Sequence, residues 1–190
     1  MMRGACLVLL LGALMAVRPA RAEGRPRFVR ERIIVTLLED GFQVEGSYVF
    51  RRTLPGEMTF SLRYPFPTGP GTEPAEVLEV RGARLGTRRA PDALLLHVTL
   101  PSGGQETEVH ITYRQRMGPR RARYLVTTAL AWDRPLERGE FLVRAPRAWG
   151  APRCTWPLPA ARQDGETSEW RWNFEPFRPR SELDLAWTGP

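Results

Sequence analysis

Runs in which apolar and polar residues alternate are the main pattern in this chain. From Phe42 to Phe50 an apolar residue or a glycine occupies every second position, and the same period returns from Met58 to Tyr64. A period of two places one set of side chains in a core and the other set in water. The Leu-Pro-Gly segment at residues 54–56 is typical of a turn. The two runs are therefore predicted to pair as an antiparallel hairpin.

Eight further segments have the length and composition of strands, and nearly all are bounded by proline or glycine. They are Arg32–Leu38, Glu76–Arg81, Leu94–Leu100, Thr107–Arg114, Tyr124–Trp132, Glu140–Ala145, Glu169–Phe174 and Glu182–Trp187. No segment shows a convincing helical period. Strands without helical spacers favour an all-β fold. We expect an antiparallel β-sandwich of roughly ten short strands, immunoglobulin-like in its general architecture.

The proline-rich stretch Pro65–Pro74 is the clearest internal break in this pattern. It is too short for a flexible linker, and the strands on its two sides need each other to build a core. We therefore interpret it as a long loop within one domain that covers residues 23–190.

A second hairpin is predicted around Gly103-Gly104. A two-residue turn there would pair Leu96 with Ile111, and every apolar residue of one strand would meet an apolar residue of the other. The same register would place His97 opposite His110 on the polar face, with Glu108 beside it. Two imidazoles and a carboxylate can hold a divalent metal. The alternative is a solvated sheet face that carries two ordinary histidines.

The first twenty-two residues resemble a secretory signal peptide. Arg3 precedes an apolar run from Ala5 to Val17, and residues 20–22 read Ala-Arg-Ala, which is typical of a cleavage site. The apolar run is shorter than the about 20 residues that span a bilayer. We expect an exported protein, periplasmic or extracellular, that begins at Glu23 and has no transmembrane anchor after cleavage. Cys154 would then be its only cysteine, so no intramolecular disulfide is expected.

Composition excludes several kinds of chemistry. All 28 basic residues are arginine, and the formal net charge is +7. Without lysine there is no Schiff-base residue and no phosphate-loop lysine. A serine-hydrolase elbow, a zinc-binding HExxH helix, a CxxC pair and a GxGxxG turn are also absent from the sequence. No cofactor is predicted.

Paired carboxylates are the remaining route to catalysis. Glu166 with Glu169, or Glu182 with Asp184, have the residue types that flank a glycosidic bond in glycan-active hydrolases. Glu182 and Asp184, however, alternate with apolar residues as on any half-exposed strand. Catalysis by either pair is therefore the weaker of the two interpretations.

Arginines cluster in two places. The first cluster lies between two predicted strands, around a Met-Gly-Pro turn, and consists of Arg114, Arg116, Arg120, Arg121 and Arg123. The second cluster consists of Arg81, Arg84, Arg88 and Arg89. Arginine forms bidentate contacts with phosphate, sulfate and carboxylate groups, so the first cluster is a candidate anion-binding site. A solvated loop is the alternative, and nucleic acid is not an expected partner because no nucleic-acid-binding motif is present.

All six tryptophans lie in the last third of the chain. Trp170, Trp172 and Trp187 share strand faces with other apolar residues and are expected in the core. Trp149 and Trp156 lie in a proline-rich region that reads as a loop, and they are the candidates for an aromatic ligand-binding site.

Several short motifs carry a family resemblance. The segment Phe42–Arg52 followed by Tyr64-Pro65-Phe66-Pro67 resembles the start of vault/inter-alpha-trypsin-type domains. The later segments resemble uncharacterised secreted bacterial β-domains; they are Tyr124–Thr128, Trp132–Leu136, Phe141–Pro146, Trp172–Pro176 and Glu182–Trp187. The resemblance implies a β-sandwich of the cell envelope and no established catalytic residues. The metal-binding adhesion domain that often follows the vault-type module is absent from this sequence.

These observations together predict an exported, non-enzymatic β-sandwich that acts by binding or in envelope assembly. An envelope protein or an anionic glycan is the expected partner. The alternative is a glycan-active hydrolase that uses paired carboxylates.

Overall fold

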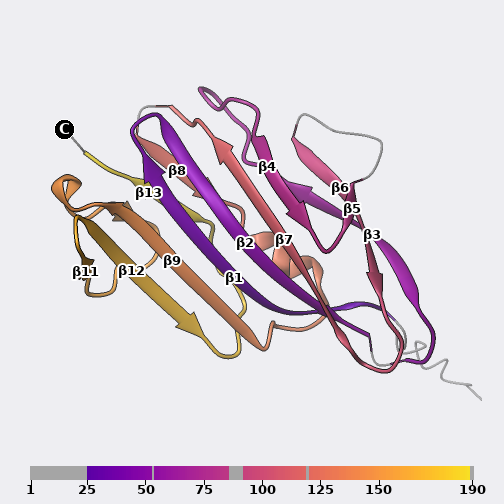
Figure 1. Ribbon diagram of the computed structural model, residues 1–190. Helices are drawn as coiled ribbons and strands as arrows, with labels where there is room; N and C mark the ends of the chain where they lie inside the picture. The colour runs from indigo at the N-terminus through magenta and orange to yellow at the C-terminus, as the bar shows by residue number, and fades with distance from the viewer. Residues whose placement is uncertain (1–24, 53, 86–91, 119, 189–190) are drawn as a thin grey trace, which may run out of the picture.

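The computed structural model describes residues 25–52, 54–85, 92–118 and 120–188, and these residues form an all-β sandwich (Figure 1). The prediction of an all-β sandwich is confirmed. Two short 3-10 helices, η1 (Thr127–Ala131) and η2 (Arg147–Trp149), interrupt the strands. In the described part of the chain, no helix is long and apolar enough to cross a lipid bilayer.

Seven strands form the larger sheet, in the spatial order β11-β12-β9-β1-β2-β7-β4. Their bounds are β1 Arg27–Leu38, β2 Gly41–Arg51, β4 Glu76–Arg81, β7 Glu106–Gln115, β9 Arg138–Pro146, β11 Arg162–Asp164 and β12 Thr167–Phe174. All neighbours are antiparallel except β1 and β9, which run parallel with Ile33 beside Phe141. The sheet is therefore mixed, which departs from the purely antiparallel arrangement predicted from the sequence.

The second layer consists of two separate three-stranded sheets, in the orders β10-β13-β8 and β3-β6-β5. Their strands are β3 Met58–Pro65, β5 Arg84–Leu85, β6 Ala93–Leu100, β8 Arg121–Tyr124, β10 Arg153–Cys154 and β13 Leu183–Ala186. Side chains of both small sheets join one face of the large sheet in a single hydrophobic core. Val35, Leu96 and Leu183 represent the three sheets in that core, and each is at most 1% exposed. The opposite face of the large sheet carries mainly polar and charged side chains, with Ile34, Val49 and Leu142 among them.

The hairpin predicted for residues 42–50 and 58–64 is wrong. The first run lies in β2, which pairs with β1 and β7, and the second lies in β3, which pairs with β6 in the other layer. Both strands still direct one apolar set of side chains into the core, because strands that face each other across a sandwich alternate in the same way as strands that pair. Alternation alone does not distinguish a hairpin from a chain that crosses between layers.

The hairpin predicted around Gly103-Gly104 is wrong for the same reason. β6 pairs with β3 and β5, whereas β7 pairs with β2 and β4. Gly103 and Gly104 both have positive φ values, 81° and 78°, so a tight turn does form there. The turn carries the chain from one layer to the other, and Leu96 and Ile111 are both fully buried in the core between the layers.

The strand predicted for Tyr124–Trp132 is wrong, because only its first residue lies in a strand. β8 stops at Tyr124, and η1 follows it. The Glu182 carboxylate accepts hydrogen bonds from the backbone N–H groups of Val126 (2.6 Å) and Thr127 (3.0 Å). Because a side chain satisfies these donors, the backbone turns away from the sheet after Tyr124.

Candidate functional site

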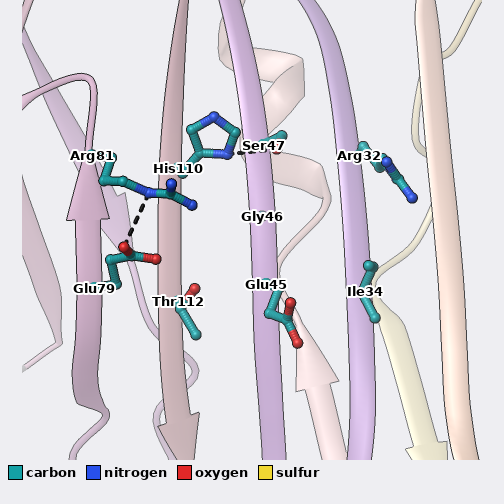
Figure 2. Close-up of a pocket in the computed structure, with 9 residues that line it drawn as sticks. All are labelled: Arg32, Ile34, Glu45, Gly46, Ser47, Glu79, Arg81, His110 and Thr112. Carbon is teal, nitrogen blue, oxygen red and sulfur yellow. Dashed lines mark hydrogen bonds and ion pairs between the residues drawn. The ribbon is translucent and has the colours of Figure 1, made fainter.

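The outer face of the seven-stranded sheet carries a shallow depression of about 180 Å³, and Figure 2 shows the residues around it. They come from four adjacent strands, β1, β2, β7 and β4, and are Arg32, Ile34, Glu45, Gly46, Ser47, Glu79, Arg81, His110 and Thr112. Apart from Ile34 and Gly46, every lining side chain is polar or charged. The local sequence does not predict this grouping, because the pairing of four strands brings the residues together.

Strand register arranges this depression as two rows. In the first row Arg32 lies beside Ser47, Ser47 beside His110, and His110 beside Arg81. Each step between strands is about 4.8 Å, so the Cα atoms of Arg32 and Arg81 are roughly 14 Å apart. The first row therefore has a guanidinium at each end and an imidazole with a hydroxyl between them.

The second row runs parallel to the first and carries the opposite charge. Ile34 lies beside Glu45, Glu45 beside Thr112, and Thr112 beside Glu79. Residues two apart on one strand point to the same side, so each row is roughly 7 Å from the other. The depression thus presents cationic donors along one side and carboxylate acceptors along the other.

Contacts within the depression hold some of these groups in place. Ser47 Oγ lies 2.9 Å from His110 Nδ1, and Arg81 Nε lies 3.0 Å from Glu79 Oε1. His110 Nε2 is 3.5 Å from Glu108 Oε2, beyond the row. Arg32 is exposed, and no carboxylate of the described residues forms an ion pair with it. Its guanidinium is the donor in the first row that has the most freedom to meet a ligand.

The predicted metal site does not form. His97 lies on β6, where its Nδ1 is 3.3 Å from Ser61 Oγ, and His110 lies on β7 in the other layer. The register that placed the two histidines opposite each other is therefore wrong. Only Glu108 and His110 stay together, and no group of three or more His, Cys, Asp or Glu side chains that could hold a metal occurs among the residues described.

The first arginine cluster is dispersed over two layers, and most of its charges meet partners. Arg114 Nε donates to Gln43, and Arg116 forms ion pairs with Asp40 (2.7 Å) and Glu73 (3.9 Å).

At the other end of the cluster, Arg120 donates to the Thr188 carbonyl oxygen, and Arg123 forms two hydrogen bonds with Asp184. The hydrogen bond with Asp184 raises the pKa of Arg123. Arg121 is exposed. The five arginines thus do not form one anion-binding loop. In the second cluster, Arg81 and Arg84 lie on β4 and β5, and Arg88 and Arg89 lie outside the described residues.

The two candidate tryptophans have different environments. Trp156 is buried, with 8% of its surface exposed, and its Nε1 donates to Ser181 Oγ at 3.1 Å. The prediction that it is exposed is wrong, because its ring packs edge-on against Phe141 in the core. Trp149 is partly buried and stacks on Trp187 with 6.0 Å between ring centroids. Trp170, Trp172 and Trp187 are buried in the core, as predicted.

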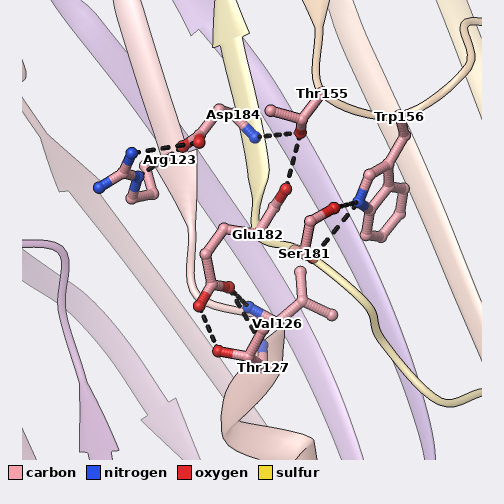
Figure 3. A network of polar contacts seen from close by, with 8 residues as sticks. All are labelled: Arg123, Val126, Thr127, Thr155, Trp156, Ser181, Glu182 and Asp184. Carbon is pink, nitrogen blue, oxygen red and sulfur yellow. Dashed lines mark hydrogen bonds and ion pairs between the residues drawn. The ribbon is translucent and has the colours of Figure 1, made fainter.

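The carboxylates proposed for catalysis have structural contacts, as Figure 3 shows for Glu182 and Asp184. Glu182 accepts the backbone bonds that end β8 and a further bond from the Thr127 hydroxyl, while Asp184 pairs with Arg123.

In the other pair, Glu169 is nearly buried and forms an ion pair with Arg144 at 2.8 Å, whereas Glu166 is exposed. Neither pair therefore consists of two carboxylates that lack such contacts and face a common cleft.

A buried polar cluster lies inside the sandwich. The four tyrosines of the chain converge there, and the Tyr48 hydroxyl lies 2.7 Å from that of Tyr64 and 3.0 Å from that of Tyr124. The Tyr124 hydroxyl is 3.5 Å from Glu31 Oε2, and Glu31 Oε1 has no hydrogen-bond partner. Burial raises the pKa of Glu31 to about 8, and the bond from Tyr124 opposes this only in part. This carboxyl is therefore neutral at pH 7, which is how the core tolerates it.

Cys154 forms no disulfide and is partly buried on β10. Burial raises the pKa of its thiol. A raised pKa lowers the thiolate fraction, so the thiol is a poor nucleophile at neutral pH.

Comparison with known proteins gives a fold and no family. No protein-family model and no curated protein matches the chain. Among solved structures, a candidate nutrient-binding protein from Legionella pneumophila superposes with a TM-score of 0.63 at 15% sequence identity, over 87% of this chain and 67% of that one. The resemblance to vault/inter-alpha-trypsin-type domains thus stays a prediction.

Part of a zinc metallopeptidase of the M1 class is similar in fold to most of this chain. A two-domain M1 peptidase variant bound to L-arginine superposes with a TM-score of 0.50 at 10% identity, over 86% of this chain. The chain spans only 43% of that peptidase. Identities this low show a shared fold alone, because one fold serves many unrelated functions.

Proposed function

We propose that this protein is an exported, non-enzymatic binding module of the cell envelope that takes an acidic sugar of a glycan on the outer face of its seven-stranded sheet. The observation that carries the proposal is the pair of rows in the depression, one cationic and one acidic. The nutrient-binding assignment of the Legionella protein with the same fold agrees with a binding role.

The two rows match the two kinds of group on an acidic sugar. A sugar carboxylate accepts bidentate hydrogen bonds from a guanidinium, and Arg32 at the end of the first row has no carboxylate partner in the described structure. Sugar hydroxyls donate to carboxylates, and Glu45 lies beside Thr112 in the second row. The roughly 14 Å length of the rows suits more than one sugar ring.

The experiment is a calorimetric titration of the purified protein with trigalacturonate and with neutral maltotriose. We expect saturable binding of trigalacturonate and none of maltotriose. Arg32→Gln should weaken binding about tenfold, the loss of one charge-assisted bidentate contact. The matched control is Arg178→Gln, which removes an exposed arginine far along the chain and should bind as the wild type does.

Two results would overturn the proposal. Equal losses in Arg32→Gln and Arg178→Gln would indicate attraction by bulk charge, which added salt would also abolish. Appearance of new reducing ends during the titration would indicate a glycan-active hydrolase instead of a binding module.

A further inference from the structure

A second set of arginines meets on the other side of the sandwich, on the sheet β10-β13-β8. Arg153 on β10 lies beside Ala186 on β13, and Ala186 lies beside Arg121 on β8. Arg121 and Arg153 are exposed, and the small side chain of Ala186 lies between them. Two steps between strands separate their Cα atoms by roughly 10 Å, so both guanidinium groups can reach a ligand above Ala186.

Arg121 and Arg153 differ from the neighbouring Arg123 because no carboxylate pairs with them in the described structure. In the adjacent row Arg123 is neutralised by Asp184 at 2.5 Å. Within the described residues, no carboxylate comes within ion-pair distance of Arg121 or Arg153, and neither side chain makes a hydrogen bond. Two exposed guanidinium groups without carboxylate partners on one face give this surface a local positive potential, which favours an anion above Ala186.

We propose that Arg121 and Arg153 form a clamp for a phosphate group. A carboxylate carries a single negative charge, which one guanidinium balances through a bidentate contact. A phosphate monoester has three terminal oxygens and a charge of roughly −1.5 to −2, which two guanidinium groups balance. The chemistry is the same whether the phosphate belongs to a sugar, a lipid headgroup or the free ion.

The clamp is independent of the acidic-sugar site. Arg32 and Arg81 lie on the outer face of the seven-stranded sheet, whereas Arg121 and Arg153 lie on the outer face of the opposite layer. Loss of either site by substitution therefore leaves the other site intact.

The test follows arginine side-chain Nε–Hε resonances by NMR in ¹⁵N-labelled protein during titration with inorganic phosphate at constant ionic strength. We expect the resonances of Arg121 and Arg153 to shift together and to saturate at one dissociation constant. Arg121→Gln and Arg153→Gln should each weaken phosphate binding about tenfold, and Arg178→Gln should leave it unchanged.

Further probes identify the chemical class and the source. Glucose 6-phosphate should compete with inorganic phosphate and glucuronate should not. Sedimentation with phosphatidylcholine vesicles that contain phosphatidic acid tests for a lipid source. If the phosphate belongs to a lipid, the protein co-sediments with these vesicles and Arg121→Gln does not. If it belongs to a soluble phosphate, the protein does not co-sediment. The proposal is overturned if all exposed arginines shift alike without saturation, or if both variants bind phosphate as the wild type does.

Discussion

The phenol ring of Tyr48 lies across the backbone of Gly46, two residues earlier on β2. Both residues face the core, and a Cβ atom at position 46 would overlap the Tyr48 hydroxyl and ring. Gly46 therefore makes room for the ring and lets its hydroxyl reach Tyr64 and Tyr124. An aromatic ring that covers a strand glycine supplies the packing surface that the glycine lacks.

Gly46→Ala should destabilise the protein by roughly 2–4 kcal/mol, because the added methyl group displaces a fully buried ring and breaks its hydroxyl contacts. Urea unfolding measures the effect. In a Tyr48→Ala background the same substitution should cost little, since the clash is then gone. An equal loss in both backgrounds would contradict the role given to Gly46.

Glu31 makes stability depend on pH. Its pKa is about 8 in the folded protein and 4.5 as a free side chain, so the folded state holds a proton that the unfolded state releases. The contribution of the protonated Glu31 carboxyl to the free energy of unfolding is fully present below pH 4.5. It is lost as the pH rises through 8, at up to about 1.4 kcal/mol per pH unit. Glu31→Gln should remove most of this loss, because the amide stays neutral.

Urea unfolding between pH 5 and 9 checks this expectation. Wild type should lose several kcal/mol over the range, and Glu31→Gln should lose much less. Glu57→Gln, which changes an exposed carboxyl, should follow the wild-type curve. A direct measurement on the wild type, carbon-13 NMR of the glutamate carboxyls, should show one group that titrates far above the others. Identical pH curves for wild type and Glu31→Gln would rule out the buried carboxyl as the cause.

Glu182 is expected to stabilise the fold. Its carboxylate accepts two backbone N–H groups and the Thr127 hydroxyl, and Glu182→Ala leaves these donors partly buried without a partner. We expect a loss of about 2–3 kcal/mol. Thermal unfolding measures it, with Glu166→Ala at an exposed position as the control. A Glu182→Ala protein as stable as the control would show that water replaces these bonds without cost.

The alternation of apolar and polar residues predicts most of the strands, but it does not predict which strands pair with each other. Phe42–Phe50 is a strand with one buried face, as its alternation indicates, yet its neighbours are β1 and β7. Pairing depends on contacts between distant segments, and the pattern of a single strand is the same in either layer. The parallel pair of β1 and β9, which links residues more than a hundred positions apart, has no local signal at all.

The metal site predicted from the sequence is wrong for the same physical reason. His97 and His110 lie near each other only if β6 and β7 pair, and they do not. The predicted anion cluster groups arginines that are close in sequence, whereas the fold places Arg121 and Arg153, thirty-two positions apart, on the two sides of Ala186. Neither row of the depression follows from local spacing, since each takes one residue from each of four strands.

Trp149 and Trp156 should respond differently to substitution. Trp156 is 8% exposed, donates to Ser181 Oγ and packs edge-on against Phe141 and Trp172. Trp156→Ala should therefore cost about 3–5 kcal/mol, the usual loss for a large aromatic removed from a core. Trp149 contributes one stacked contact at the edge of the core, so Trp149→Ala should cost only about 0.5–1.5 kcal/mol.

Fluorescence separates these two roles further. Trp149→Ala uncovers the ring of Trp187, which is 5% exposed in the intact protein, and should shift the remaining tryptophan emission to longer wavelength. Trp149→Phe keeps a stacked ring over Trp187 and should give no such shift.

Addition of trigalacturonate or phosphate should leave the emission unchanged in all three proteins, since neither proposed site contains a tryptophan. A ligand-induced change that disappears in Trp149→Ala would instead place an aromatic binding site at this end of the sandwich.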